Sequence, residues 1–336
     1  MKLALVASAH GFGHLTRLIA IGEALRGLGV EPTFFTAAPP ALVHETLPGA
    51  VVRPWWVDVG LVQQDSLTED VPATLRLLDE RASEAAIGRL AHALSGFDRV
   101  ASDTAPTALE AARRAGVDAI AVGSFGWDWI YARYAGLEAW AARFAAWQAP
   151  HPALEMWPGP GLFGFRSVER VGLVARTRPA HRVGPWTALA SFGGFGLRGL
   201  DALLPRIPGL IWVVAPPMMP LDRPDCVAAP GVPYPALVAG CDVVFTKPGY
   251  GILAECLAAG TPIVWAPRGA FPEAPHLEVA MRARGDIRID HPVGDPAGFR
   301  RALAAALQRL HGQPRPLRSA ADGAARVAHR LVEGIS

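Results

Sequence analysis

The same three-part pattern occurs near the start of the chain and again past its middle: a short apolar strand, a glycine-rich loop and a helix. In the first copy, Leu3 to Ala7 is the expected strand, residues 8 to 14 are the loop, and the helix ends near Leu28. In the second copy, Thr187 to Ser191 leads into the loop Phe192-Gly193-Gly194-Phe195-Gly196 and a further helix. Apolar strands without polar alternation are typical of parallel sheets that helices cover on both faces. The repeat therefore predicts an α/β protein with two doubly wound domains.

The length of 336 residues also fits two domains better than one. A stretch rich in proline and arginine, residues 176–185, separates the two copies and is the expected linker. We expect the N-terminal domain over residues 1–175 and the C-terminal domain over residues 186–318. Residues 319–336 are expected to form a last helix that packs back toward the N-terminal domain.

Composition excludes several classes of protein. Hydrophobic residues make up 51% of the chain, yet no run of about 18 uninterrupted apolar residues occurs, so we expect buried sheets and no transmembrane segment. The first apolar run is too short for a signal sequence, which predicts a cytoplasmic protein. The formal charge of +2 argues against general binding of nucleic acid. Cys226, Cys241 and Cys256 form no CxxC pair, so buried thiols are expected rather than zinc or disulfides.

The segment from Phe245 to Cys256, FTKPGYGILAEC, joins a buried strand to a helix through a loop with two glycines. Gly249 and Gly251 would let a ligand approach the backbone, and the first N–H groups of the helix, near Tyr250, would point outward. This geometry suits a diphosphate, to which Lys247 could add a positive charge. A structural strand-to-helix turn is the alternative.

Glu255 lies four residues after Gly251, about one helical turn from the loop. Its carboxylate could accept hydrogen bonds from a ribose diol, or it could be an ordinary solvated glutamate. A later loop adds Glu273 and His276 as groups that could face a sugar, unless they only mark the start of a helix.

The first glycine-rich loop and the helix after it carry two histidines and an arginine, His10, His14 and Arg17. The loop is not a GxGxxG sequence and no acidic residue follows the second strand, so no nicotinamide cofactor is expected. A histidine at this position could act as general base for a hydroxyl, because its ordinary pKa is near neutrality. Asp103 ends another expected strand at the same edge of the sheet, so it could orient His14. The alternatives are a structural histidine and an aspartate that caps the next helix.

Two further segments of the N-terminal half could bind an acceptor. Ser124 to Tyr131, SFGWDWIY, is aromatic and contains an acid. The ring of Trp127 could pack on a sugar while Asp128 binds hydroxyls, or the aromatic residues could belong to the core. The loop over residues 55–70, which contains Asp65, is unusually long for an ordinary connection.

Taken together, these motifs resemble glycosyltransferases of the GT-B type, in which two Rossmann-like domains face each other across a cleft. The C-terminal glycine loop with Glu255 is similar to the sugar-nucleotide half of the GlcNAc transferases that make the peptidoglycan lipid precursor. Nearly the whole chain resembles the glycosyltransferase-like N-terminal region of plant arabinokinases. The segments that carry this likeness are HGFGHLTR (10–17), SDTAP (102–106), SFGWDWIY (124–131) and KPGYG (247–251).

The resemblance implies an inverting, metal-independent transferase that moves a sugar from a nucleoside-diphosphate sugar, with UDP-sugar favoured, to a hydroxyl of a small-molecule or lipid-linked acceptor. It implies that His14 is the catalytic base, for which Asp103, from its place at the end of a strand, is the candidate catalytic partner. The donor-binding candidates are Gly193, Gly194, Lys247, Gly249, Tyr250, Gly251, Glu255, Glu273 and His276. The acceptor-binding candidates are His10, Gly11, Gly13, Arg17, Asp65, Trp127 and Asp128.

No cofactor is expected. The sequence has no Asp-x-Asp motif, and in GT-B enzymes a helix dipole and basic side chains can neutralise the departing diphosphate. The likeness does not extend into a kinase domain, so we expect a transferase module without one. Two alternatives remain open at this point: a nucleotide-sugar sensor without catalysis, and a nucleotide-sugar epimerase.

Overall fold

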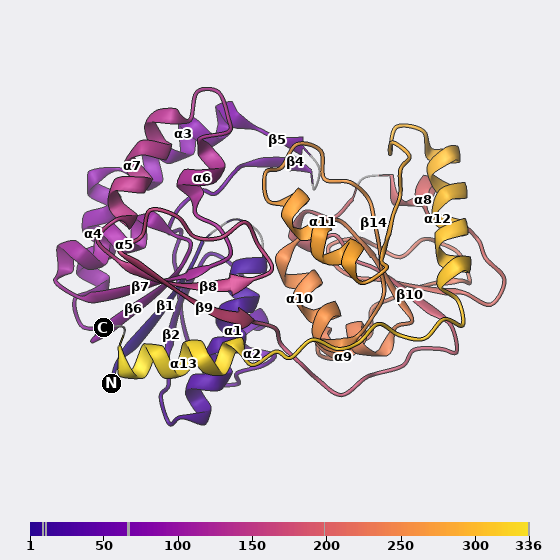
Figure 1. The fold of residues 1–336 in the computed structure, drawn as a ribbon, viewed down its shortest axis with the longest axis horizontal. Coiled ribbons are helices and arrows are strands. Elements are labelled where there is room, and N and C mark those ends of the chain that lie inside the picture. The colour runs from indigo at the N-terminus through magenta and orange to yellow at the C-terminus, as the bar shows by residue number, and fades with distance from the viewer. Residues whose placement is uncertain (9, 11, 66–67, 198, 335–336) are drawn as a thin grey trace. The chain divides into compact units, whose positions relative to one another are not determined.

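A computed structural model describes the chain from Met1 to Ser336 except residues 9, 11, 66–67, 198 and 335–336. The chain divides into two compact units (Figure 1). Unit 1 comprises Met1–Val62, Glu69–Ala175 and Ala321–Ser336, and unit 2 comprises Gln63–Thr68 and Arg176–Ala320. Within the described residues, no helix is both long and apolar enough to cross a membrane.

Unit 1 is built on a seven-stranded parallel sheet with the order β3-β2-β1-β6-β7-β8-β9. Its strands are β1 (Leu3–Ala7), β2 (Thr33–Thr36), β3 (Val51–Pro54), β6 (Arg99–Asp103), β7 (Asp118–Gly123), β8 (Pro152–Trp157) and β9 (Ser167–Leu173). Two short strands, β4 (Gln63–Asp65) and β5 (Thr68–Glu69), pair with each other outside this sheet. The central strand β1 is buried along its whole length, as its uninterrupted apolar sequence predicts.

Helices cover both faces of the unit 1 sheet (Figure 1). They are α1 (Gly13–Gly27), α2 (Ala41–His44), α3 (Val71–Arg81), α4 (Glu84–Leu94), α5 (Pro106–Ala115), α6 (Trp127–Tyr131), α7 (Glu138–Gln148) and α13 (Gly323–Glu333). The last of these, α13, packs against α1 and β9. Gly323 permits this contact, because a Cβ atom there would lie 2.6 Å from the carbonyl oxygen of Leu173.

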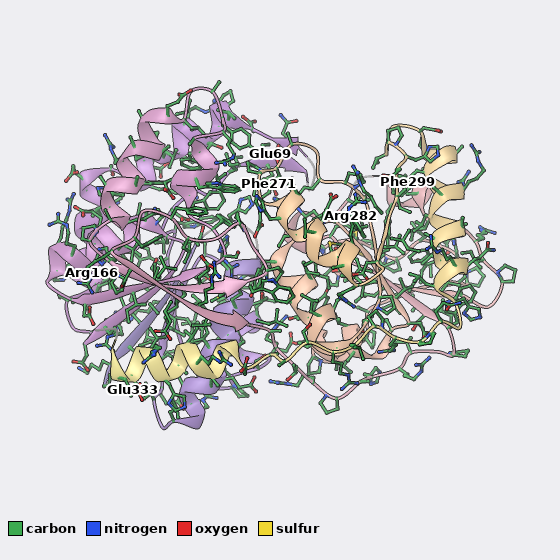
Figure 2. All side chains as sticks on the ribbon, viewed as in Figure 1. Glu69, Arg166, Phe271, Arg282, Phe299 and Glu333 are labelled. Carbon is green, nitrogen blue, oxygen red and sulfur yellow. The ribbon has the colours of Figure 1, made fainter. Side chains whose placement is uncertain are left out.

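Unit 2 is built on a six-stranded parallel sheet with the order β12-β11-β10-β13-β14-β15. Its strands are β10 (Thr187–Ala190), β11 (Ile211–Val214), β12 (Cys226–Ala228), β13 (Val243–Thr246), β14 (Ile263–Trp265) and β15 (Ile287–Arg288). The helices α9 (Tyr234–Gly240), α10 (Tyr250–Ala259) and α11 (Ala274–Ala283) cover one face, and α8 (Leu200–Leu203) and α12 (Pro296–Leu310) cover the other (Figure 1). Phe299 of α12 is fully buried beside Phe245 in this core (Figure 2).

Several segments differ from the sequence-based expectation. The second glycine loop forms a single 3-10 turn, Gly193–Phe195, and the helix after it is only the short α8. The strands β8 and β9, which complete the unit 1 sheet before residue 176, were not among the strands expected from the sequence. The cysteines, by contrast, agree with the expectation: Cys226, Cys241 and Cys256 are buried free thiols.

Candidate active site

The first polar cluster lies in unit 1, at the carboxyl ends of two neighbouring strands. Ala7 of β1 pairs in register with Asp103 of β6, so the loop after β1 and the end of β6 are adjacent. The loop leads into α1, whose second residue is His14. Because β1 and β6 are parallel neighbours, residues 89 positions apart in the sequence meet at this edge.

His14 and Asp103 form a buried pair. The Nδ1 atom of His14 lies 2.9 Å from Oδ1 of Asp103, and the side chains are 4% and 0% exposed. The hydroxyl of Thr104 lies 3.0 Å from the same ring nitrogen. Thr104 has a φ of 49°, which is unusual for a β-branched residue and turns the chain sharply behind Asp103. A histidine held at Nδ1 by a carboxylate presents Nε2 as its second ring nitrogen.

Arg17 completes this cluster from the next turn of α1. Its Nε donates to Oδ2 of Asp103 at 2.9 Å, and one terminal nitrogen donates to Oδ1 at 2.6 Å. The other terminal nitrogen donates to the hydroxyl of Ser124 at 3.0 Å. Burial by itself raises the pKa of Asp103, but the charge of Arg17 and the contacts with His14 outweigh it and lower the pKa below its ordinary value. Asp103 is therefore a carboxylate at neutral pH.

The aromatic side chain of Trp127 packs beside both histidines. The indole of Trp127 is fully buried, and its N–H donates to the hydroxyl of Ser8, which in turn donates to Asp58 at 3.0 Å. The ring of Trp127 lies edge-on to His10, with centroids 5.0 Å apart, and 6.1 Å from the ring of His14. These contacts pack an uncharged aromatic ring beside both histidine rings.

The second polar cluster lies in unit 2. Glu255, on α10, is paired with Arg176, whose Nε and a terminal nitrogen lie 2.8 and 2.7 Å from the same carboxylate oxygen. Both side chains are buried. Ser191, which follows β10, shares a hydrogen bond with the hydroxyl of Tyr234 at the start of α9. Burial and then the nearby charge of Glu255 raise the pKa of Tyr234, so its hydroxyl keeps its proton.

Both glycine loops of unit 2 leave room above the backbone. A Cβ atom at Gly193 would meet nothing within 4 Å, and one at Gly249 would approach only the carbonyl of Lys247, at 4.0 Å. Gly249 is the residue before the first turn of α10, and it has no side chain that could cap this helix start. A helix start that directly follows a glycine loop is a geometry that can bind an anion.

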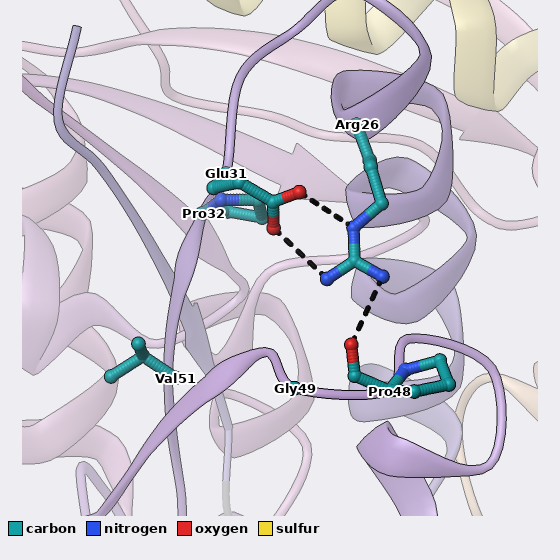
Figure 3. A pocket seen from close by; sticks show the side chains of 6 residues that line it. All are labelled: Arg26, Glu31, Pro32, Pro48, Gly49 and Val51. Atoms are coloured by element: carbon teal, nitrogen blue, oxygen red, sulfur yellow. Dashed lines mark hydrogen bonds and ion pairs between the residues drawn. The ribbon is translucent and has the colours of Figure 1, made fainter.

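A surface hollow in unit 1 lies away from the His14–Asp103 cluster. Figure 3 shows it beside an ion pair in which Arg26 binds Glu31 and reaches the carbonyl of Pro48 at 3.3 Å. Arg26 belongs to the last turn of α1, about 18 Å along the helix from His14 at 1.5 Å per residue. The hollow is therefore not part of the candidate site. Among the described residues, no group of three or more His, Cys, Asp or Glu side chains could hold a metal ion.

The sequence is similar to that of a plant sugar kinase, L-arabinokinase. No family model matches the chain. L-arabinokinase of Arabidopsis thaliana is 30% identical over 308 residues, which cover 82% of this chain. The chain spans only 29% of the length of that relative.

Solved structures give the fold. The glycotransferase of kitacinnamycin has a TM-score of 0.65 at 21% identity, with 98% of this chain and 97% of that chain covered. The glycosyltransferase SsfS6 of Streptomyces sp. SF2575, complexed with thymidine diphosphate, has a TM-score of 0.55 at 20% identity, with 99% and 96% covered. The chain has the GT-B fold. The predicted fold class and the likeness to arabinokinase are confirmed.

Within the GT-B fold, the residues predicted to bind an acceptor are not all placed where an acceptor could touch them. Arg17 is 2% exposed and its guanidinium is committed to Asp103 and Ser124. Trp127 is also buried, so its ring belongs to the core, as the alternative interpretation had it. Asp128 is partly exposed, and one of its carboxylate oxygens is buried without a hydrogen bond to any described residue.

The other acceptor candidates are His10, Gly11, Gly13 and Asp65. His10 contacts the backbone of Leu61 through Nδ1, at 3.0 Å from the carbonyl oxygen, and Gly13 is the first residue of α1. Asp65 belongs to β4, but its side chain is not described, and Gly11 lies outside the described residues.

The remaining donor candidates lie around the carboxyl edge of the six-stranded sheet in unit 2. Lys247 follows β13, and Tyr250 and Gly251 open α10. Glu273 is buried just before α11, while His276, within α11, is exposed. Gly194 lies in the 3-10 turn after β10.

Sequence reasoning missed several polar side chains of the two clusters. Arg176 was assigned to the linker, and Ser191, Thr104 and Arg268 had no assigned role. Arg268 is buried after β14, with its guanidinium carbon 3.5 Å from the centroid of the Phe271 ring. The signal that could have found Thr104, Ser191 and Arg268 is their position at or just after the carboxyl end of a strand, whereas Arg176 only opens the expected linker.

Proposed function

We propose that this chain is an inverting glycosyltransferase that uses a nucleoside-diphosphate sugar and needs no metal ion. The observation that carries the proposal is the buried His14–Asp103 pair, 2.9 Å apart, at the carboxyl edge of unit 1 in a chain with the GT-B fold. A general base and an orienting carboxylate are what activation of a hydroxyl requires. A module that only bound nucleotide would need neither group.

In the proposed reaction, Nε2 of His14 takes the proton of an acceptor hydroxyl while the hydroxyl oxygen attacks the anomeric carbon. A bond forms between that oxygen and the anomeric carbon, and the bond from the anomeric carbon to the diphosphate breaks with its electron pair. Attack opposite the leaving group inverts the anomeric centre. Asp103 stabilises the imidazolium formed on His14 through its contact with Nδ1.

Unit 2 holds the donor in this proposal. The N–H groups that open α10, near Gly249, Tyr250 and Gly251, bind the diphosphate, and Lys247 adds charge. Glu255 accepts hydrogen bonds from the ribose. A carboxylate has room for about four hydrogen bonds, so Arg176 and a ribose can share it. The complex of SsfS6 with thymidine diphosphate supports a donor of the nucleoside-diphosphate class.

The donor half is tested by calorimetric titration of the protein with UDP, dTDP and GDP and their sugar conjugates. We expect one nucleotide to bind, with UDP the first to examine, and Glu255→Gln to weaken it. If a folded protein binds none of them, the proposed function is wrong.

The catalytic half is tested by sugar release or transfer from the nucleotide sugar that binds. His14→Ala is expected to abolish turnover and to leave nucleotide binding intact. Tight binding without turnover to any acceptor would identify a sensor instead, and release of an epimer without an acceptor would identify an epimerase.

A further inference from the structure

The guanidinium of Arg17 lies between the two members of the catalytic pair. One terminal nitrogen is 2.6 Å from Oδ1 of Asp103 and 2.7 Å from Nδ1 of His14. A second contact, from Nε to Oδ2, makes the interaction of Arg17 with Asp103 bidentate. The contact with Ser124 anchors the remaining nitrogen of the fork. All of these side chains are buried, so water does not screen their charges.

This arrangement differs in charge from a simple histidine–aspartate pair. An isolated buried carboxylate favours a protonated imidazole, because the imidazolium then neutralises it. A histidine that is already protonated cannot accept a proton from a hydroxyl. Here the carboxylate of Asp103 is neutralised by Arg17, and the positive charge of Arg17 stands beside Nδ1 of His14. Both effects oppose protonation of the ring.

We infer that Arg17 is a positioning residue that keeps His14 neutral: it takes up the charge of Asp103 while leaving Oδ1 able to accept the Nδ1–H of His14. The carboxylate then orients the ring without converting it into a permanent cation. Nδ1 can donate a proton to Asp103 or accept a hydrogen bond from Arg17, and only the first tautomer leaves Nε2 as the nitrogen that acts as base. The inference rests on the proposed role of His14, but its test involves no turnover, so the two can fail separately.

Other charged groups near His14 are few among the described residues. The ring of His10, in the loop after β1, has its centroid 6.4 Å from that of His14. Asp58, from the segment after β3, reaches the cluster through Ser8 and Trp127. The side chains contributed by α6 and the loop before it, Phe125 and Trp127, are uncharged aromatic rings. Among the described residues, Arg17 and Asp103 are charged groups in direct contact with the His14 ring.

The first measurement needs only the unaltered protein. Proton–nitrogen correlation NMR of the imidazole rings, with His14→Gln to assign the signal, reports both the charge and the protonated nitrogen of His14. We expect a neutral ring at neutral pH with its proton on Nδ1. A ring that is protonated at neutral pH, or that carries its proton on Nε2, would overturn the inference.

The second measurement removes the cation. In Arg17→Met the pKa of His14 should rise by about one to three units, because Asp103 then has only the imidazole as a partner. In Arg17→Lys, the matched control, the charge remains and the pKa of His14 should stay close to its original value. An unchanged pKa in Arg17→Met would show that Arg17 has only a structural role.

A third comparison covers the case in which Arg17→Met does not fold. Asp103→Asn leaves the cation beside His14, whereas Arg17→Met with Asp103→Asn removes both charges and keeps the site neutral. We expect the pKa of His14 to be lower in the single variant than in the double variant, because only the single variant retains the repulsion. Equal values would contradict the inference.

Discussion

Arg176 and Glu255 form a buried ion pair in unit 2, with two guanidinium nitrogens at 2.8 and 2.7 Å from one carboxylate oxygen. The two residues come from the chain just after β9 and from the middle of α10, 79 positions apart. The pair places a cation against the residue proposed to bind ribose.

Loss of either partner of this pair should destabilise the protein. Arg176→Met is expected to lower the free energy of unfolding by roughly 3–5 kcal/mol, because it leaves the carboxylate of Glu255 buried and unpaired. Urea unfolding measures the change. The double variant with Glu255→Gln serves as the control, and it should be more stable than Arg176→Met alone. A double variant that loses the sum of the two single effects would show that the pair is not coupled.

His14, the proposed general base, should contribute to rate and not to donor binding. His14→Ala is expected to lower kcat by about 10²- to 10⁴-fold, the usual contribution of such a base, with nucleotide affinity unchanged. Steady-state kinetics and calorimetry on the same preparation separate the two quantities. His92→Ala, on α4 of the same unit, is a matched control that should behave as the unaltered protein. A His14→Ala protein with normal kcat would exclude this residue as the base.

Asp286 should make stability depend on pH in the mildly acidic range. Burial raises its pKa to about 6, against the opposing charge of Arg284. The folded protein therefore holds this proton more tightly than the unfolded chain, so its contribution is complete below about pH 4 and is lost as the pH rises through about 6. A shift of about two units corresponds to about 3 kcal/mol.

The comparison of the original protein with Asp286→Asn isolates this effect. Asparagine keeps a carbonyl oxygen to accept the N–H of Ile263, which Asp286 binds at 2.8 Å, but it does not titrate. Relative to the variant, the original protein should become less stable between about pH 4 and pH 6 and should show no further change above that range. A difference in unfolding free energy that stays constant with pH would contradict the prediction.

Two glycines in helices of unit 1 should respond to alanine in opposite directions. At Gly323 a Cβ atom would lie 2.6 Å from the carbonyl oxygen of Leu173, so alanine must push α13 away from β9 and lower the melting temperature. At Gly88, within α4, a Cβ atom would meet nothing within 4 Å. Alanine there should raise stability by about 1 kcal/mol through helix propensity. Thermal unfolding of the two variants measures both effects. Equal changes in melting temperature for Gly323→Ala and Gly88→Ala would contradict the prediction.

The sequence predicted the architecture through its apolar strands. Runs such as Leu3 to Ala7 can be satisfied only inside a parallel sheet, and the ends of parallel strands meet at one edge. This reasoning brought His14 and Asp103 together correctly as neighbours. It did not anticipate β8 and β9, because prolines, glycines and charged residues in and around them hide the strand pattern.

The partners of the long basic side chains were beyond sequence reasoning. Arg17 was expected to face an acceptor, and the structure places it on Asp103, 86 positions away. Arg176 was expected in a linker, and it is buried on Glu255. An arginine has several rotatable bonds and reaches many positions, so its partner depends on where the surrounding elements come to lie.

The chain leaves unit 1 at Ala175, builds unit 2, and returns to unit 1 at Ala321. Val327, Ala328 and Leu331 of α13 are fully buried in this last segment. During synthesis on a ribosome, therefore, unit 1 cannot finish folding until α13 has emerged, although most of unit 1 is made first. Unit 1 expressed as residues 1–175 would lack part of its own interior, and a version meant to stand alone should have residues 321–334 joined back to it.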